Sequence, residues 1–189
     1  MKHRVFLAID LPDKTRQKVL DLAGKLNPLH LPILWEKPEK LHLALNFLGK
    51  IADEQILQVN RQITAVSSVT VSFPLEIRFL NTLYQRHESS LVYLGLSGDL
   101  APLLDLQKQL SGRFERISLP QPRRFFPHIT IGRIKKSDPV TVKSQLGKID
   151  DSNINFLAKF SVDHLTLYES LVSHSGSSYQ TIRRFMLQS

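Results

Sequence analysis

Two histidines begin similar four-residue segments, His42-Leu43-Ala44-Leu45 and His128-Ile129-Thr130-Ile131, which stand roughly half the chain length apart. Each segment follows a loop that contains proline. Histidine titrates near neutral pH, so one imidazole can take a proton from water while a second gives a proton to a departing oxygen. A matched pair of histidines therefore suits phosphodiester hydrolysis without a metal ion.

The neighbouring residues supply groups that could bind a phosphate. Side chains i and i+2 of a β-strand point to the same face, so Ala44 should lie beside His42 and Thr130 beside His128. The Thr130 hydroxyl can donate a hydrogen bond to a phosphate oxygen, which helps most where charge builds in the transition state. Arg133 is a candidate cationic clamp. We take the two histidines as candidate catalytic residues, and Thr130 and Arg133 as candidate substrate-binding residues.

The histidine pattern alone is not specific. His164-Leu165-Thr166-Leu167 has the same form, and a lone histidine in a strand is more often structural than catalytic. Pro127 before His128 and Arg133 after it favour the earlier segment. Phe125-Phe126 beside Arg123-Arg124 suits base stacking and phosphate binding, and equally suits one buried ring with solvated arginines.

Other kinds of site are disfavoured. The eight glycines are scattered, so no glycine-rich phosphate loop exists, and no Gly-x-Ser-x-Gly segment occurs. His-x-x-x-His spacing is absent, which argues against a zinc site. The sequence has no cysteine, which excludes disulfides, thiolate metal sites and a cysteine nucleophile. We expect no metal and no other cofactor.

Composition predicts a globular chain with a polyanionic partner. The 189 residues are 42% hydrophobic, which indicates one domain or two small lobes that share a core, and we take residues 1–189 as a single two-lobed domain. Lys and Arg number 25 against 17 Asp and Glu, a net charge of +8 that favours RNA, nucleotides or anionic lipid surfaces. The first apolar run is too short for a signal peptide, and none approaches the ~20 residues of a membrane span. We expect a cytoplasmic monomer.

Periodicity and turn residues predict alternating strands and helices. Several of the predicted strands follow one another through short turns, which indicates an α+β fold with antiparallel sheets. The expected strands cover residues 5–9, 41–48, one or two within 69–80, 91–96, 128–134, 160–168 and 179–187, and the expected helices run from 11 to 26, from a cap at Asp53, from 100 to 114 and weakly from 140 to 146. Residues 85–90 should form an exposed turn.

Four blocks of the chain resemble the two-histidine phosphoesterase superfamily, in order and at that family's spacing. They are Arg4-x-Phe6-x-Ala8-Ile9-x-Leu11-Pro12, Pro38-x-x-Leu41-His42-Leu43-x-Leu45-x-Phe47-Leu48-Gly49, Pro127-His128-Ile129-Thr130-Ile131-x-Arg133 and Leu167-Tyr168-Glu169-Ser170. The most similar branch is that of the RNA 2′,3′-cyclic phosphodiesterases, also called 2′-5′ RNA ligases (LigT/ThpR-like). The resemblance runs from the first predicted strand to the last.

This resemblance implies a bilobal α+β fold with pseudo-twofold symmetry, in which antiparallel sheets line a central cleft and helices lie outside. It implies metal-free hydrolysis of a 2′,3′-cyclic phosphate to a 2′-phosphate on RNA ends or small cyclic nucleotides. Some relatives also join RNA ends reversibly through 2′-5′ linkages without ATP. The family's catalytic histidines fall on His42 and His128, its second-motif threonine on Thr130 and its nearby arginine on Arg133.

One residue departs from the family pattern. The first motif's threonine is Ala44 here, so one hydroxyl that would bind phosphate is missing. A lost hydrogen bond to a charged group is worth about 1.5–3 kcal/mol, or roughly ten- to hundredfold in rate. Three hypotheses stay open: an enzyme, an RNA or cyclic-nucleotide binding protein with weak turnover, and a structural basic protein with incidental histidines.

Overall fold

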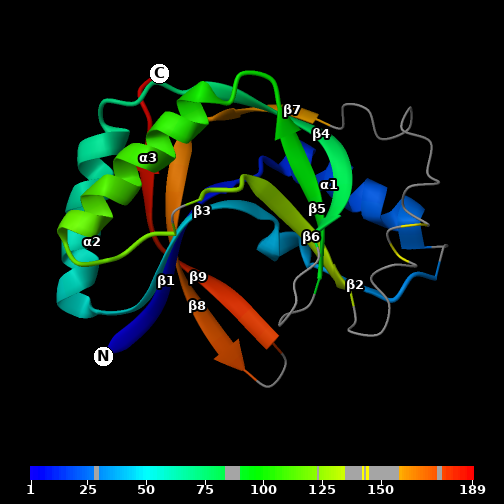
Figure 1. Cartoon of the computed structure of the whole chain (residues 1–189), viewed down its shortest axis with the longest axis horizontal. Helices are drawn as coiled ribbons and strands as arrows, with labels where there is room; N and C mark the ends of the chain where they lie inside the picture. Colours follow the sequence, from blue (N-terminus) through cyan, green and yellow to red (C-terminus); the bar gives the residue numbers. More distant parts are fainter. Residues whose placement is uncertain are drawn as a thin grey trace.

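The computed structural model describes residues 1–27, 30–83, 90–122, 124–134, 142, 144, 158–173 and 176–189. Figure 1 shows one strongly curled β-sheet with its helices on the outside of the curl. The elements in chain order are β1 (Lys2–Asp10), α1 (Asp13–Leu26), β2 (Ile33–Trp35), the 3-10 helix η2 (Pro38–Lys40), β3 (His42–Ala52), α2 (Asp53–Ser67), β4 (Phe73–Leu83), β5 (Leu91–Ser97), α3 (Ala101–Arg116), β6 (His128–Ile134), β7 (Ala158–Val162), β8 (His164–Ser173) and β9 (Gly176–Met186).

The two histidine strands lie side by side at the centre of this sheet. The strand order is β7-β4-β5-β6-β3-β1-β8-β9, with β2 paired to β6 off this path. Along this path four strands stand on each side of the β6–β3 junction, where Leu43 pairs with Ile129. These neighbouring strands pair in the antiparallel sense. The predicted α+β class, with antiparallel sheet and external helices, is confirmed.

Alternation along β3 and β6 separates core residues from cleft residues. Leu43 and Ile129 are completely buried, whereas His42 and His128 are only partly buried. The helices bury apolar stripes against the convex side of the sheet, as their three- and four-residue spacing predicts. Their buried apolar residues are Val19, Leu22 and Leu26 of α1, Val59, Ile63 and Val66 of α2, and Leu103, Leu106, Leu110 and Phe114 of α3.

Several predicted boundaries were wrong. The strand predicted for residues 160–168 is two strands that separate at Asp163: β7 pairs with β4, whereas β8 pairs with β1 and β9. The strand predicted to end at Leu48 runs on to Ala52, because Gly49 adopts a φ of +73° beside an irregular register with β1. The helix α2 reaches Ser67, so β4 starts at Phe73 and not at residue 69 as predicted.

Asp53 is the first residue of α2 and not its cap. Ala52 occupies the capping position, and its N–H donates to the Gln55 side chain at 3.1 Å. The Asp53 carboxylate instead accepts from the Met1 amino group and contacts His3, at 2.9 Å in both cases. This pairing ties the start of β1 to the start of α2.

Two predictions fall largely outside the described residues, namely the turn at 85–90 and the helix at 140–146, of which only Ser90, Val142 and Ser144 are described. No helix in the described part of the chain combines the length and hydropathy that crossing a membrane requires.

Candidate active site

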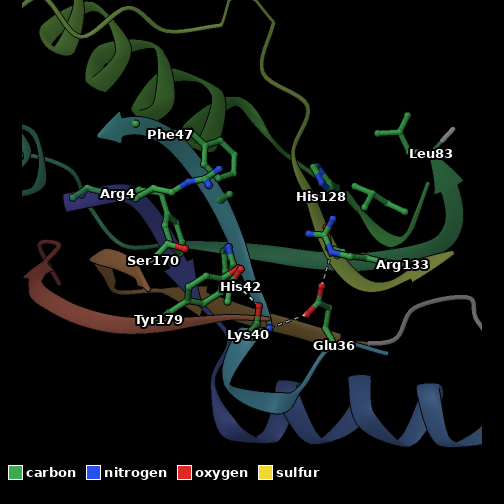
Figure 2. Close-up of a pocket in the computed structure, with 17 residues that line it drawn as sticks. Arg4, Glu36, Lys40, His42, Phe47, Leu83, His128, Arg133, Ser170 and Tyr179 are labelled. Carbon is green, nitrogen blue, oxygen red and sulfur yellow. Dashed lines mark hydrogen bonds and ion pairs between the residues drawn. The ribbon is translucent and has the colours of Figure 1, made fainter. Parts of the chain in front are cut away.

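A cavity of about 450 Å³ lies on the concave face of the sheet, where β3 and β6 meet (Figure 2). Its walls include His42 and Ala44 from β3 and His128, Thr130 and Arg133 from β6. All the candidate catalytic and substrate-binding residues of the sequence analysis thus line one cavity. Ala44 also faces the cavity, at the position where the family pattern has a threonine.

Main-chain carbonyls hold both imidazoles in the same way. His42 Nδ1 lies 2.8 Å from the Lys40 carbonyl oxygen, and His128 Nδ1 lies 2.8 Å from the Phe126 carbonyl oxygen. A carbonyl can only accept, so each Nδ1 must carry the hydrogen. In a neutral ring Nε2 is then the proton acceptor, and in a charged ring it is a donor. Each histidine therefore presents Nε2 as its proton-transfer atom.

Matched aromatic contacts restrict both rings further. His42 has a tilted contact with Phe6 at 5.0 Å between centroids and an edge contact with Tyr179 at 5.4 Å. His128 stacks on Phe126 at 5.2 Å and meets Tyr93 edge-on at 5.7 Å. Each imidazole thus has one phenylalanine near its face and one tyrosine at an angle close to perpendicular. These rings were not identified from the sequence as partners of the histidines.

The surroundings of the two histidines differ in burial. Phe6 is 4% exposed, whereas Phe126 is 48% exposed. Burial lowers the pKa of His42 below the usual histidine value, and the nearby charge of His128 acts in the same direction. The Lys40 carbonyl and the charges of Asp10 and Glu36 oppose this shift without cancelling it. His42 is therefore neutral at physiological pH, a state in which it can accept a proton.

Glu36 holds the arginine of the site. Arg133 Nε donates to Glu36 Oε1 at 3.0 Å, and Lys40 Nζ lies 4.0 Å from the other carboxylate oxygen. Figure 2 shows the Arg133 guanidinium between Glu36 and His128. The sequence analysis missed Glu36, because it follows the three-residue strand β2 and belongs to no recognisable motif. Its contact with Arg133 depends on the pairing of β2 with β6.

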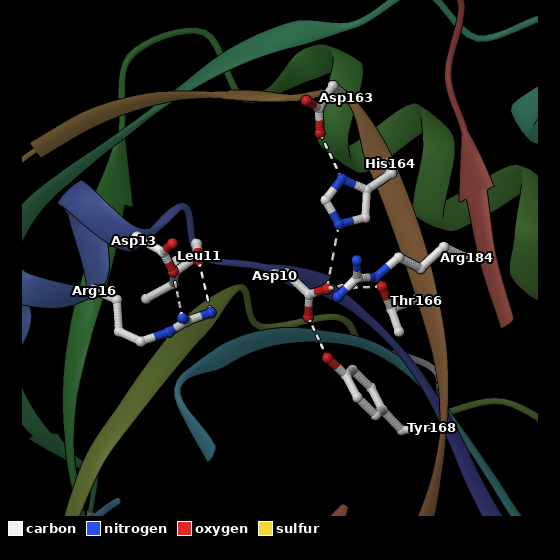
Figure 3. A network of polar contacts seen from close by, with 9 residues as sticks. All are labelled: Asp10, Leu11, Asp13, Arg16, Asp163, His164, Thr166, Tyr168 and Arg184. Atoms are coloured by element: carbon white, nitrogen blue, oxygen red, sulfur yellow. Dashed lines mark hydrogen bonds and ion pairs between the residues drawn. The ribbon is translucent and has the colours of Figure 1, made fainter. Parts of the chain in front are cut away.

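The alternative segment on β8 does not line this cavity. Instead His164 Nε2 lies 3.2 Å from Asp10 Oδ2, and Thr166 Oγ1 donates to the same oxygen at 2.7 Å (Figure 3). Tyr168 Oη donates to the other oxygen of Asp10 at 2.5 Å, and Asp163 accepts from His164 Nδ1 at 2.5 Å. We call these five residues the Asp10 cluster. The third His-x-Thr segment thus binds an internal carboxylate.

Within the Asp10 cluster, the pKa values of Asp10 and His164 shift in opposite directions. Burial by itself would raise the pKa of Asp10, but hydrogen bonds from His164, Tyr168 and Thr166 outweigh it and lower that pKa to about 2. The hydrogen bond to Asp10 raises the pKa of His164, against the effect of burial, and Asp163 adds to the increase. At neutral pH the cluster therefore contains a charged carboxylate.

Two further expectations concern binding groups. Phe125 is partly buried and packs against the core, whereas Phe126 is 48% exposed, so the second ring of that pair is the more accessible one. Arg124 is exposed, and Arg123 lies outside the described residues. Within the described ranges, no group of three or more His, Cys, Asp or Glu side chains is arranged to hold a metal ion.

The chain is similar to known proteins over most of its length. The sequence model of a protein family, the 2′-5′ RNA ligase superfamily, matches residues 36–173, which include both cleft histidines. The chain is similar to the RNA 2′,3′-cyclic phosphodiesterase of Escherichia coli (27% identity, 97% of this chain and 96% of that protein). It is also similar to the protein of the same name from Methanocaldococcus jannaschii (21% identity, 96% and 99%).

Solved structures match over the whole chain. The crystal structure of E. coli LigT complexed with 3′-AMP has a TM-score of 0.81 at 25% identity, and the match covers 100% of both chains. The crystal structure of a Thermus thermophilus protein, TT0787, has a TM-score of 0.79 at 20% identity, over 98% of both chains. The curled antiparallel sheet is thus a known architecture.

Proposed function

Because this chain belongs to the 2′-5′ RNA ligase superfamily, we propose that it is an enzyme that hydrolyses 2′,3′-cyclic phosphate ends of RNA to 2′-phosphates. Its relatives named RNA 2′,3′-cyclic phosphodiesterase align over nearly their full length. The observation that carries the proposal is the shared geometry of His42 and His128. Both line one cavity, and both have Nδ1 bonded to a carbonyl, which leaves Nε2 for proton transfer.

The reaction needs two proton transfers. A water oxygen attacks the phosphorus of the cyclic phosphate, and the Nε2 of one histidine takes the proton that the water loses. The bond from phosphorus to the 3′-oxygen breaks, and the other histidine protonates that oxygen through its own Nε2. The products are a 2′-phosphate and a free 3′-hydroxyl. Each histidine ends in the other's starting charge state, and exchange with solvent resets the pair.

The electrostatics of the cleft support particular roles. A lowered pKa keeps His42 neutral, which suits the base that receives the proton of water. His128 would then be the acid for hydrolysis, and the roles exchange in the reverse direction. The Thr130 hydroxyl and the guanidinium of Arg133 line the same cavity, so they are placed to stabilise charge on the non-bridging oxygens.

The same chemistry extends to RNA joining. If a 5′-hydroxyl replaces water as the nucleophile, the proton transfers are unchanged and the product is a 2′-5′ phosphodiester. No ATP is consumed, because the cyclic phosphate supplies the leaving oxygen. Within this proposal residues 1–189 act as one two-lobed domain, because the strands on each side of the sheet's centre supply one histidine each. The domain works as a cytoplasmic monomer on RNA ends or small cyclic nucleotides.

Ala44 supports a second candidate, a protein that binds cyclic nucleotides or RNA ends with little turnover. The cavity wall beside His42 has a methyl group where a hydroxyl would contact phosphate. One experiment separates the candidates: incubation with a nucleoside 2′,3′-cyclic phosphate and EDTA, followed by identification of the product. Conversion to the 2′-phosphate supports the enzyme. Binding without conversion supports the second candidate, and dependence on added metal would overturn the mechanism.

A further inference from the structure

We propose that Arg4, Lys50 and Phe47 form a subsite for the nucleotide next to the terminal one, that is, the nucleotide before the one that carries the cyclic phosphate. Through this subsite the cleft selects polynucleotide ends over free cyclic nucleotides. This inference rests on the proposed function. It concerns the end of the cavity formed by β1, the later part of β3, β8 and β9, to which the reaction assigns no role.

The subsite is continuous with the reacting centre. Arg4, Phe47, Ser170 and Tyr179 line the same cavity as the two histidines. In Figure 2 Arg4 extends from β1 toward Phe47, on the opposite side of His42 from Arg133. A chain that leaves the reacting phosphate in this direction therefore stays inside one cavity.

Strand pairing sets the cations in a row. Arg4 on β1 pairs with Lys50 on β3, and Ser170 on β8 pairs with Tyr179 on β9. The Val5–Glu169 pair lies one step along β1 and β8, so Ser170 is the cross-strand neighbour of Arg4. Directly paired residues of antiparallel strands point to the same face. The row thus combines two positive charges with hydroxyl groups that can donate to phosphate oxygens.

Within the part of the chain that the structure describes, neither Arg4 nor Lys50 forms an ion pair. The acidic residues closest to them along the strands are engaged elsewhere: His3 contacts both Asp53, at 2.9 Å, and Glu169, at 2.7 Å. By contrast, Glu36 engages Arg133 and Lys40. Two adjacent cations without a carboxylate are therefore available to a phosphate from outside the protein.

Phe47 supplies the complementary surface for a base. Its side chain is 65% exposed although it lines the cavity, and its ring lies 6.0 Å from that of the buried Phe6. Exposed aromatic rings beside cations bind single-stranded nucleic acid, because bases stack on the ring while the cations follow the backbone. An exposed ring, two free cations and hydroxyl groups next to a phosphodiesterase centre fit one further nucleotide.

The test compares two substrates that share the reacting group. One is a mononucleoside 2′,3′-cyclic phosphate, and the other is an oligoribonucleotide that ends in the same group. Wild-type kcat/KM should favour the oligoribonucleotide. Arg4→Gln and Phe47→Ala should each reduce this preference about fivefold to tenfold, which is the effect of a partly solvated charge-assisted or stacking contact. The matched controls Arg61→Gln and Leu57→Ala on α2 should leave the preference unchanged.

A binding measurement keeps the inference independent of turnover. Fluorescence anisotropy with an unreactive oligoribonucleotide ending in a 3′-phosphate, and competition by the mononucleoside 3′-phosphate, give both affinities without catalysis. Arg4→Gln should weaken oligoribonucleotide binding and reduce its salt dependence by about 0.7 in the log–log slope, the value for one lost phosphate contact on a single strand. A loss of affinity by the same factor for both ligands, or equal wild-type affinity for the two, would overturn the subsite.

If wild-type protein prefers the oligoribonucleotide in binding but hydrolyses neither substrate, the proposed function fails and the subsite stands. If it hydrolyses both substrates with equal kcat/KM, the function stands and the subsite fails. The double variant Arg4→Gln/Lys50→Gln should lose more affinity for the oligoribonucleotide than Arg4→Gln alone, and no further loss would remove Lys50 from the inference.

Discussion

The His-x-Thr segments of β6 and β8 have the same spacing but different surroundings. On β6, His128 and Thr130 face an open cavity. On β8, His164 and Thr166 bind the carboxylate of Asp10 from the neighbouring strand β1. The residue that pairs with His128 on its own neighbouring strand β5 is Gly95, which has no side chain to offer. The ring of Phe79 on β4 covers the space that a Cβ at Gly95 would take, so an aromatic ring lies where β1 places a carboxylate beside β8.

The β8 segment also binds the carboxylate of Asp10 on the side of β1 that faces away from β3. Asp10 pairs with His42 across β1 and β3, so its side chain starts on the same face as the imidazole. Its two oxygens are nevertheless bonded on the β8 side, by Tyr168, Thr166 and His164. The third segment therefore binds the carboxylate next to the candidate base. Among the described residues that line the cavity, the charged ones are Arg4, Glu36, Lys40 and Arg133.

The largest expected effect is on turnover when the histidines are removed one at a time. His42→Ala and His128→Ala should each lower kcat by about 10²–10⁴-fold, the contribution of a positioned proton-transfer group, and the double variant should be little worse. His164→Ala should keep most of the turnover and lower the melting temperature instead. A steady-state assay together with thermal unfolding of the three variants measures both effects. Loss of turnover in His164→Ala with retention in His128→Ala would reverse the assignment.

The threonines provide a matched pair with a smaller effect. Thr130→Val removes a hydroxyl from the cavity and should lower kcat/KM about ten- to hundredfold at unchanged stability. Thr166→Val removes a buried donor to a charged carboxylate and should lower the free energy of unfolding by about 1.5–3 kcal/mol, with turnover close to wild type. Urea unfolding and kinetics on both proteins check this. Similar outcomes for the two variants would mean that the two segments do not differ in function.

Activity that depends on His42 and stability that depends on His164 should respond to pH in opposite ways. Hydrolysis needs neutral His42, and its pKa is lowered, so the acidic limb of the kcat/KM profile should lie below the usual histidine value of about 6.5. The pKa of His164 is raised, so the stability that its charge contributes is complete below about pH 6.5 and is lost as pH rises through the raised value.

The stability difference between wild type and His164→Gln, followed by thermal unfolding from pH 5 upward, should therefore shrink with increasing pH. A difference that grows over this range would contradict the charge on His164. Asp10 affects stability at acidic pH. Its pKa of about 2 means that its contribution is present above about pH 3.8 and is lost as pH falls through about 2.

The sequence predicted those features whose cause is local. Leu43 and Leu45 alternate with His42 and Ala44, as Ile129 and Ile131 do with His128 and Thr130. This alternation predicted the two strands and placed each histidine on the face opposite the apolar side chains, while the pairing of β3 with β6 that brings the two faces together came only from the structure. Sequence spacing could not reveal Glu36 or Asp10, because their partners are Arg133 and His164, which are reached only through strand pairing. Similarly, the separation of β7 from β8 at Asp163 depends on which strand each of them pairs with, although their sequences run on as one apolar pattern.

Ala44 provides the test with the smallest expected effect, and it concerns the cavity between β3 and β6. It lines the cavity together with His42, at the position where the family pattern has a threonine. Ala44 is only partly buried, and it pairs with Ala8 on β1, whose side chain is also small. Ala44→Thr should therefore fit, since its β-branched side chain suits a strand. It should raise kcat/KM by no more than the ten- to hundredfold of a charge-assisted hydrogen bond, and by less if the phosphate is already held by Thr130 and Arg133.

The matched control Ala44→Val adds nearly the same volume without a hydroxyl. A gain in Ala44→Thr but not in Ala44→Val, at similar melting temperatures, would identify the hydroxyl as the cause. A lower melting temperature in both variants with no gain in rate would show that this position is filled by packing, at a cost of about 1–3 kcal/mol, so that the missing hydroxyl does not limit turnover.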